Sequence, residues 1–480
     1  MKTIKTFFVS FVFLCLGLVP ISAMGQSLPH TFSANTAAKA SEVNANFQYL
    51  LERFGTRRTT VNCYSGESIT TALQNYNHIV ISGICSEILH LEATSLPHRL
   101  VILEGSSSSS DGINANGVSP PQTDSSYTSN AVVYAHGSIT IKISRLKLTG
   151  GTHGVESWLG PAVIIENALI ENNTTHGIAL WGNSSGWIKN STIQNNGESA
   201  ILGWSSHVDI DSNTISGHTN NSSIKITRSG SAWIENNTIT NGKYAGISID
   251  RGASADIRSN TIQSAEHGIS VLDSSHAILK NNTVNSNSNS GLYVDNNASV
   301  ILAEGNTFSY NSNYGITLWL GGSLNMWCDA QLTTATTISN NTQGAIKVNN
   351  GGTIALCRLT LTSPNEGVFL WQASHAYLNH VTITGSNTYG LRAYGTNVDF
   401  DNSTISGSTN AEIRADYSVI YMENTAITGT SGSNEIKLAY GSKLFIGTGT
   451  TITGTVYCDG SVDNNSIGNF ANLTLTTSGC

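Results

Sequence analysis

The sequence predicts an all-β fold, a parallel β-helix, and two observations lead to that prediction. The first is a short motif that ends in threonine followed by an apolar residue and returns every 22 to 24 residues between positions 189 and 307. The second is that each copy contains short runs in which apolar and polar residues alternate, with Gly, Asn and Ser between the runs. Alternation at period two inside a repeat of this length indicates stacked coils of β-strands. The motif threonines are Thr192, Thr214, Thr238, Thr261, Thr283 and Thr307.

Other repeat folds fit the sequence less well. A helical repeat is excluded because no segment keeps a period of 3.6 residues and because Asn, Gly and Ser disfavour helices. A leucine-rich repeat is excluded because its Leu and Asn spacing is absent. We therefore expect three short strands per coil, each paired with its equivalent one coil along, about 4.8 Å away. Alternate apolar residues should point inward, and the residues between them outward.

The first 25 residues have the pattern of a secretory signal peptide. Lys2 and Lys5 precede an apolar run over residues 7–19, and small residues follow at 23–25. The mature chain is then exported, to the cell surface or the medium or, alternatively, the periplasm. No later stretch is apolar enough to cross a bilayer. A net charge of −8, with 11% charged residues, argues against nucleic acid as a partner.

Residues 26–56 are expected to form a linker and a short amphipathic helix. Apolar residues at helical spacing place the helix at 40–54. The segment resembles a short element with the pattern F-x-A-G-T-x-A-x-A-x-E-V-N-A-N-F, found at the N-terminus of exported bacterial proteins and some phage tail proteins, with Asn35 in place of the Gly. Three roles are open for it: capping the solenoid, docking to another chain, or oligomerisation through residues 40–54.

The β-helix is expected over residues 57–457. A capping helix at 68–74 precedes strands at 78–83, 88–93 and 99–104. This order resembles the N-terminal cap of right-handed parallel β-helix proteins of the pectin-lyase-like class, which implies a right-handed coil. Residues 105–130, with five consecutive serines and Pro120-Pro121, predict a long loop, and residues 458–480 predict a C-terminal cap.

Six cysteines remain outside the signal peptide, and their spacing predicts three disulfides. Two pairs are separated by 22 residues, which is one coil, and a third pair shares its position relative to the motif on neighbouring coils. A zinc site is the alternative, but there is no CxxC. The predicted pairs are Cys63 with Cys85, Cys328 with Cys357, and Cys458 with Cys480.

One outward position collects aromatic residues and suggests a ligand-binding surface. It directly follows the strand with the pattern Gly-apolar-x-apolar and holds Trp158, Trp181, Trp204, Trp319 and Trp371. Flat rings one coil apart form a surface on which sugars can stack, although the rings can equally pack on one another. Arg392 and Arg414, outward in the same strand, can hold an acidic polysaccharide, or they can be ordinary solvated side chains.

The sequence offers only weak candidates for catalysis. His176 belongs to a column that also holds His153 and His267, and Asp250, Arg251 and Asp295 approach the acidic calcium cluster with a nearby Arg that pectate lyases use. However, Asp250 and Asp295 are two coils apart, about 10 Å, which is too far for one calcium ion. The aspartate trio and Gly-His-Gly of polygalacturonases and the Asp-Pro-His of mannuronan epimerases are absent.

Three hypotheses of function follow. The first is an exported protein that binds carbohydrate or a cell-surface partner along the tryptophan column without catalysis and needs no cofactor. The second is a polysaccharide lyase or other carbohydrate-modifying enzyme that acts on an anionic glycan, with calcium as its cofactor. The third is a purely structural component of an envelope or fibre. Fold alone cannot decide among them, because this solenoid supports all three.

Overall fold

The computed structural model describes residues 57–120, 129–326, 334–429 and 434–459, together with the strand β49 (Leu475–Ser478). The chain divides into two compact units, Met1–Arg57 and Arg58–Cys480, and the strands that the structure describes lie in the second. The predicted signal peptide, the linker and the helix at 40–54 lie outside the described residues and remain predictions. In the described part of the chain, no helix is long and apolar enough to cross a membrane.

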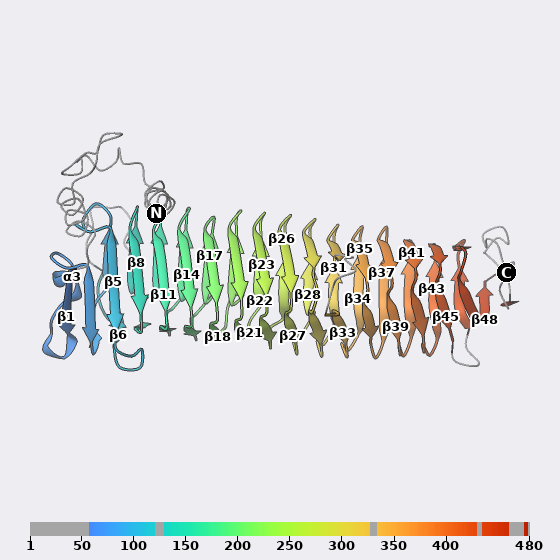
Figure 1. Ribbon diagram of the computed structural model, residues 1–480, viewed down its shortest axis with the longest axis horizontal. Coiled ribbons are helices and arrows are strands. Elements are labelled where there is room, and N and C mark those ends of the chain that lie inside the picture. Colours follow the sequence, from blue (N-terminus) through green and yellow to red (C-terminus); the bar gives the residue numbers. More distant parts are fainter. Residues whose placement is uncertain (1–56, 121–128, 327–333, 430–433, 460–474, 479–480) are drawn as a thin grey trace, which may run out of the picture. The chain divides into compact units, whose positions relative to one another are not determined.

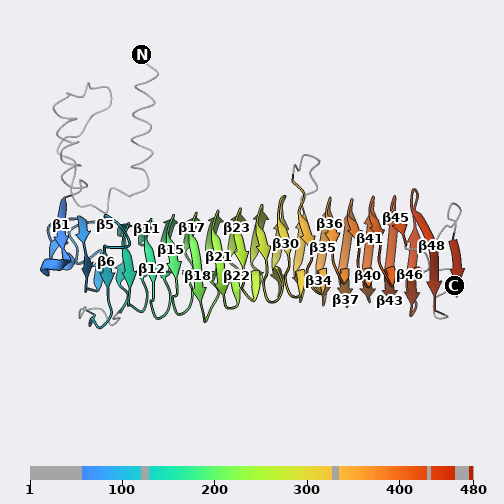
Figure 2. The same ribbon diagram turned by 90° about the horizontal axis from the view of Figure 1, so that it is seen from below.

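The second unit is a parallel β-helix, as predicted. Its coils follow one another in sequence order from β1 (Arg58–Asn62) to β48 (Thr451–Cys458) (Figures 1 and 2). A typical coil contains β13 (Ile178–Trp181), β14 (Ser185–Lys189) and β15 (Thr192–Gln194), which pair in parallel with β16, β17 and β18 of the next coil. Equivalent strands therefore build three sheets, here called sheet A, sheet B and sheet C.

Sheet C and sheet A carry the surfaces discussed below. The relevant strands of sheet C are β10 (Val155–Trp158), β13, β16 (Ile201–Trp204), β19 (Ile224–Thr227), β22 (Ala245–Asp250), β25 (His267–Val271), β28 (Leu292–Val294), β31 (Tyr314–Leu318), β34 (Gly344–Asn349), β37 (Glu366–Trp371), β40 (Tyr389–Tyr394), β43 (Ala411–Asp416) and β46 (Asn434–Ala439). Those of sheet A are β8 (Thr140–Ser144), β11 (Ala162–Glu166), β14, β17 (His207–Asp211), β20 (Ser231–Glu235), β23 (Ser254–Arg258), β26 (His276–Lys280), β29 (Ser299–Leu302), β32 (Ser323–Met326), β35 (Thr353–Cys357), β38 (His375–Asn379), β41 (Asn397–Asp401), β44 (Val419–Glu423) and β47 (Lys443–Ile446).

Sheet B contains the threonine motif and confirms the register. Its strands include β15, β18 (Thr214–His218), β21 (Thr238–Gly242), β24 (Thr261–Gln263), β27 (Thr283–Asn285) and β30 (Thr307–Ser309). The six motif threonines are direct partners from coil to coil. Side chains about two dozen residues apart in sequence are therefore neighbours. Outward side chains at equivalent positions consequently form continuous rows along the surface of each sheet.

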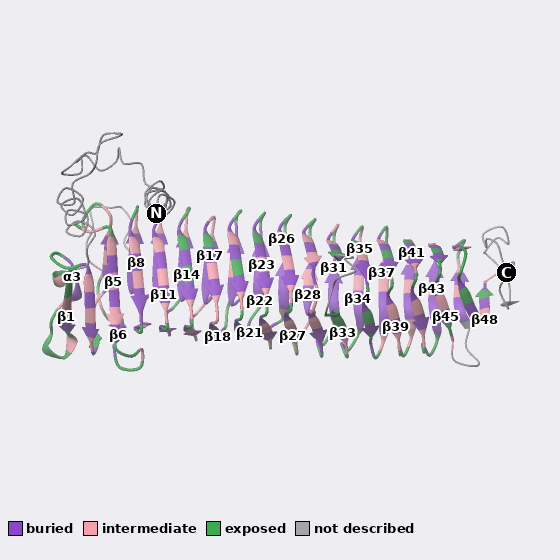
Figure 3. Ribbon diagram, viewed as in Figure 1, coloured by how far each residue is buried: buried purple, intermediate pink, exposed green. Residues whose placement is uncertain are grey.

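The inward positions of the strands form one continuous apolar core. In β13, Ile178 and Leu180 are fully buried, and their equivalents on the next coils repeat this (Figure 3). Each buried side chain of this size contributes about 1.5–3 kcal/mol. Ladders of asparagine side chains provide hydrogen bonds for the turns between sheets. The side-chain amide of Asn213 donates to the side-chain oxygen of Asn237 and to the carbonyl of Ile188, and Asn237 donates in the same way to Asn260.

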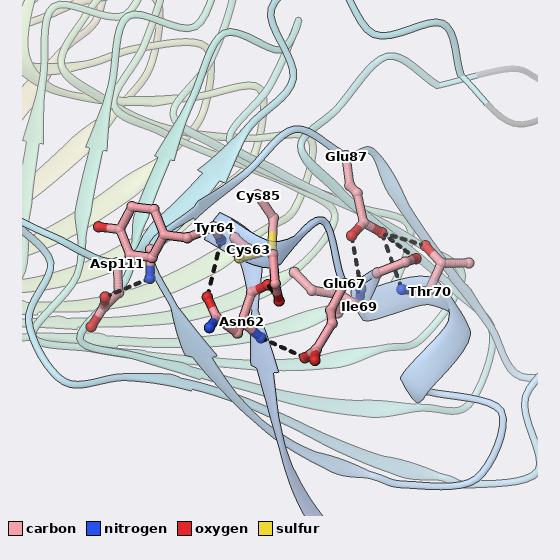
Figure 4. Close-up of a disulfide and its surroundings, with 12 residues drawn as sticks. Asn62, Cys63, Tyr64, Glu67, Ile69, Thr70, Cys85, Glu87 and Asp111 are labelled. Atoms are coloured by element: carbon pink, nitrogen blue, oxygen red, sulfur yellow. Dashed lines mark hydrogen bonds between the residues drawn. A yellow bond between two sulfur atoms is a disulfide. The ribbon is translucent and has the colours of Figure 1, made fainter.

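The N-terminal cap follows the prediction closely. Helix α3 (Ile69–Ala72) begins after Ser68, whose hydroxyl accepts from the amide of Thr71. Glu87 accepts the free amides of Ile69 and Thr70, which fixes the helix over the first coil (Figure 4). Strands β2 (His78–Ser82), β4 (Leu89–Glu92) and β5 (Leu100–Gly105) lie where the sequence predicts strands.

The disulfide prediction is confirmed where it can be checked. Cys63 and Cys85 are bonded, with their α-carbons 4.9 Å apart (Figure 4). Cys357 and Cys458 are disulfide-bonded as well. Their predicted partners, Cys328 and Cys480, lie outside the described residues, so these two pairings remain predictions.

The prediction of a loop over residues 105–130 is wrong in part. This segment contains β6 (Gly112–Asn114), which pairs with β3 (Ile84–Cys85) and β9 (Lys147–Thr149), so it completes a coil. The serine-rich run is held by the buried carboxylate of Asp111, which accepts from the amides of Gly83, Ser106 and Ser107. Burial alone would raise the pKa of Asp111, but the hydrogen bonds outweigh it and lower that pKa to about 2.

Candidate functional site

The outer face of sheet C has three rows of side chains, one for each outward position of its strands. We call the row that follows each strand's last apolar residue the tryptophan row. The outward position inside the strand forms the central row, and the position before the strand glycine forms the histidine row. The register places Trp158, Trp181, Trp204 and Asp250 in the tryptophan row, with Thr227 between the last two.

All seven ligand-binding residues proposed from the sequence lie on this face. Trp319 and Trp371 continue the tryptophan row, because Leu318 pairs with Val348 and Asn349 with Trp371. Arg392 and Arg414 pair with each other in the central row. The structure therefore gathers residues that are spread over more than half of the sequence onto a single sheet.

The first three tryptophans stack on one another. The rings of Trp158 and Trp181 are 5.2 Å apart and nearly parallel, and those of Trp181 and Trp204 are 5.1 Å apart and tilted by 49°. The Arg228 guanidinium covers the far side of the stack, 4.2 Å from the Trp204 ring. All three tryptophans remain partly exposed. Ring-on-ring packing, one alternative from the sequence, thus occurs together with an accessible aromatic edge.

The second half of the face combines cations with aromatic rings. The Lys347 ammonium lies within 6.0 Å of the rings of Trp319 and Phe369. Arg392 contacts the Phe369 ring and is 3.3 Å from the carboxylate of Glu366. Further along, Trp371 stacks on Tyr394 at 4.3 Å.

Arg414 has its own carboxylate partner. Its guanidinium lies 2.9 Å from Asp416 and also donates to the hydroxyl of Tyr389. These bonds raise the pKa of Arg414, and about a third of its side chain remains exposed. This half therefore presents cations held in fixed positions by rings and carboxylates.

His176 occupies the histidine row as a neutral, oriented imidazole. Its ring stacks on that of His153 at 5.3 Å, and its Nδ1 accepts from the backbone amide of Ser199. The proton of the neutral ring is therefore on Nε2, which lies 3.3 Å from Glu198. Burial, with smaller contributions from His153 and Lys225, lowers the pKa of His176 to about 3.

The remaining catalytic candidates are not brought into one cluster. Asp250 is buried and lies 3.3 Å from the ammonium of Lys225. Asp295 accepts from the hydroxyl of Tyr293, two coils further along. Arg251 is exposed in the turn after β22. Within the described residues, no three His, Cys, Asp or Glu side chains come together in a way that could hold a metal ion.

Several polar atoms on this face are buried without a hydrogen-bond partner among the described residues. They are Trp181 Nε1, Ser199 Oγ, Thr227 Oγ1 and Asp250 Oδ1, on four successive coils. Buried polar atoms in proteins are nearly always paired, so these four atoms are exceptions among the described residues of this face.

Sequence reasoning missed several of the residues that shape this face. Ser199 carries one of the unpaired hydroxyls, and Tyr314, Phe369 and Tyr389 hold the cations. Writing out all three outward rows, including their small and neutral members, would have placed every one of them on the same face. Sequence reasoning also missed Trp187 and Trp233, which lie on sheet A.

Comparison with known proteins agrees with the architecture. The family model described as "Right handed beta helix region" matches residues 129–222 and 199–342. The fold of the chain is a right-handed parallel β-helix. No curated protein sequence matches it.

Solved structures similar to this β-helix protein share little sequence with it. The periplasmic alginate epimerase AlgG is 11% identical, with a TM-score of 0.39 over 65% of this chain and 76% of its own. The catalytic domain of a GH87 alpha-1,3-glucanase in complex with tetrasaccharides is 14% identical, with a TM-score of 0.35 over 80% and 68%. The A-module of Azotobacter vinelandii mannuronan C-5 epimerase AlgE6 is 13% identical, with a TM-score of 0.26 over 87% and 98%. These similarities transfer neither residues nor activity to this chain.

Proposed function

We propose that this protein is an exported β-helix that binds a polysaccharide, free or on a cell surface, along the outer face of sheet C without chemical conversion. The observation that carries the proposal is the tryptophan row, where three partly exposed rings occupy consecutive coils. Sugar rings stack on aromatic faces and edges, and a polymer can contact several coils at once. Further along the face, the partly exposed guanidinium groups of Arg392 and Arg414 supply donors for sugar hydroxyls.

The central row indicates which polysaccharides the second half of the face can accept. From Lys347 to Lys437 the central row holds the four cations Lys347, Arg392, Arg414 and Lys437 and no carboxylate, because the partners Glu366 and Asp416 lie in the neighbouring rows. A polymer with carboxylate or sulfate groups is therefore attracted to this half more than a neutral one. We include anionic glycans in the test for that reason.

Affinity electrophoresis tests the proposal. The wild-type protein is run through native gels that contain alginate, polygalacturonate or a neutral polysaccharide, beside a Trp181→Ala/Trp204→Ala double variant. We expect at least one polymer to retard the wild type and the double variant to lose most of that retention. Tyr310→Ala is the matched control, because Tyr310 is an exposed aromatic residue in the turn between β30 and β31 and belongs to none of the three rows. Equal retention of the double variant and the wild type would exclude the tryptophan row as the polysaccharide-binding site.

A polysaccharide-modifying enzyme is the second candidate, and one observation favours it. Asp250 is buried beside Lys225 with one oxygen unpaired, an arrangement typical of polar groups that meet a reacting ligand. Incubation with uronate polymers, followed by ultraviolet absorbance of unsaturated products, tests this candidate. Product formation that Asp250→Asn abolishes would establish catalysis. If no polymer yields products and no polymer retards the protein, a structural role in an envelope or fibre is favoured.

A further inference from the structure

The outer face of sheet A has a row of aromatic residues that the proposed function does not use. This row, here called the sheet A row, is the middle outward position of each strand. Four of its members are exposed aromatic residues: Trp187 is 57% exposed, Trp233 44%, Tyr377 38% and Tyr421 45%. They are among the most exposed large apolar side chains of the described residues, and they lie on regular strands rather than in turns.

The exposed rings occur on alternate coils, with aspartates between them. Asp209 pairs with both Trp187 and Trp233, and Asp399 pairs with both Tyr377 and Tyr421. Counted from Trp187 as coil zero, the register puts the exposed rings on coils two, eight and ten and the aspartates on coils one, three and nine. The row runs Trp187, Asp209, Trp233, Asp256, Ile278, Ile301, Asn325, Ala355, Tyr377, Asp399, Tyr421 and Phe445. All four exposed rings therefore lie on even-numbered coils, and the two pairs are separated by an even number of coils.

Local contacts hold the rings in place and leave them accessible. The Arg258 guanidinium lies 4.7 Å from the centre of the Trp233 ring and is itself held by two hydrogen bonds to Asp256. Ser185 and Ser231 precede Trp187 and Trp233 by two residues on the same outer face, so each ring has a small side chain beside it in its own strand.

The second pair of rings borders a hollow in the surface. Tyr377, Asp399, Tyr421 and Phe445 contribute to a cavity of about 530 Å³, together with the carboxylates of Asp401 and Glu423. Both ends of the sheet A row thus combine exposed rings with acceptor oxygens. Aromatic faces and carboxylate oxygens are the groups that bind the apolar faces and the hydroxyls of sugars.

We propose that the sheet A row is a second binding surface and that its ligand is an extended, neutral β-1,4-linked glycan lying across the coils. Two coils span about 10 Å. In an extended β-1,4-linked chain, alternate sugars face the same way, and the repeat of two sugars is close to that length. Every second sugar can then stack on an exposed ring, and an aspartate lies beside the sugar between.

Charge decides against an anionic ligand on this surface. Around the first pair of rings, the carboxylates Asp209, Asp211, Glu235 and Asp256 outnumber the cations Lys189 and Arg258. Around the second pair, Asp399, Asp401 and Glu423 outnumber Lys443. Like charges would repel a uronate polymer, whereas carboxylates accept hydrogen bonds from the hydroxyls of a neutral chain. The two faces therefore select different polysaccharides.

Affinity electrophoresis in gels that contain hydroxyethylcellulose tests this inference. We expect the wild type to be retarded and a Trp187→Ala/Trp233→Ala double variant to show an apparent dissociation constant at least tenfold higher. The conservative double variant Trp187→Tyr/Trp233→Tyr should keep most of the retention, because an aromatic ring remains on each coil. Circular dichroism of each variant checks that the β-helix is intact, which the exposure of both side chains favours.

The double variant Trp181→Ala/Trp204→Ala on sheet C is the matched control, and it should bind hydroxyethylcellulose as the wild type does. The inference is overturned if the polymer does not retard the wild type, or if the Trp187→Ala/Trp233→Ala variant is retarded equally. Loss of retention only in the sheet C control would also overturn it, while leaving the proposed function in place.

Discussion

The aromatic residues of sheet C and of sheet A differ in one respect, the number of coils between them. On sheet C, Trp158, Trp181 and Trp204 occupy consecutive coils and their rings touch. On sheet A, Trp187 and Trp233 are separated by the coil of Asp209 and both remain exposed. Rings one coil apart are at stacking distance, whereas rings two coils apart are not. Coil spacing therefore decides whether the rings of an aromatic column stack on one another.

A contact within sheet A supports the same rule. Tyr421 and Phe445 are on consecutive coils of that sheet, and their rings stack at 4.7 Å with an interplanar angle of 9°. The sheet does not prevent stacking, so the alternation with aspartate keeps the other rings apart. The predictions below test this contrast, beginning with the largest expected effect.

Replacement of a stacked tryptophan should cost far more stability than replacement of an isolated one. Trp181→Ala removes contacts to the rings on both sides and should lower the free energy of unfolding by about 2–4 kcal/mol. Trp187→Ala, on sheet A, should change it by less than about 0.5 kcal/mol. Urea unfolding followed by circular dichroism measures both. Equal losses for the two variants would contradict the contrast between the faces.

The same contrast applies to charge pairs. Lys225→Met leaves Asp250 buried without its cation and should destabilise the protein by about 2 kcal/mol, less than a fully buried pair would lose because Lys225 is partly exposed. Lys142→Met, on sheet A, breaks the exposed pair with Glu166 and should cost less than about 1 kcal/mol. The midpoint of urea unfolding at neutral pH distinguishes them. A smaller loss for Lys225→Met than for Lys142→Met would show that the sheet C pair is solvated.

Acid should destabilise sheet C through its neutral histidine. The folded-state pKa of His176 is about 3, well below the value of 6.5 expected for the unfolded chain, so the unfolded state binds the proton first. The stabilisation that neutral His176 gives the folded state is complete above pH 6.5. It is lost as the pH falls toward 3, at about 1.4 kcal/mol per pH unit. Between neutral pH and pH 5.5, the free energy of unfolding should therefore fall by about 1.4 kcal/mol less in His176→Gln than in the wild type.

The control for this titration is His207→Gln, which alters an exposed imidazole on sheet A. A change seen in both variants is attributed to the loss of an imidazole in general, and the difference between the two variants to His176. Parallel pH profiles for His176→Gln and the wild type would show that His176 does not carry the acid response.

The smallest expected effect comes from converting the sheet A pattern into the sheet C pattern. Asp209→Trp places a ring on the coil between Trp187 and Trp233, so all three should stack and stabilise the protein by about 0.5 kcal/mol. Acrylamide quenching of tryptophan fluorescence should fall as the rings cover one another. Asp209→Ala adds no ring and is the control. Unchanged quenching in Asp209→Trp would mean that spacing does not determine exposure.

The fold could be predicted from the sequence because the repeat leaves little choice of register. The threonine motif and the alternating apolar residues give the same alignment, and the structure confirms it. The strand within residues 105–130 could not be predicted because a single apolar residue, Ile113, marks it. The serine-rich run before it is organised by a carboxylate of the same segment, Asp111, which the periodicity does not indicate.

The site was only partly predictable, for physical reasons. The register places residues in rows, so Trp181 and Arg392 could be assigned to one face. It does not show which carboxylate a cation selects: Arg258 directly faces Glu235 in the ladder but binds Asp256 instead. Burial of outward residues such as Asp250 and Ser199 depends on the side chains around them, which periodicity does not encode.

The alternation of rings and aspartates on sheet A has a consequence for how such proteins can change over evolution. Because every coil pairs with its neighbours in the same way, a gene duplication or deletion of one whole coil, such as residues 276–298, leaves a chain that can still close its ladders. The two pairs of rings on either side would then be separated by an odd number of coils instead of an even one. A ligand with a two-unit period could engage one pair or the other, but no longer both in step, so single-coil insertions would act as a switch on avidity rather than on folding.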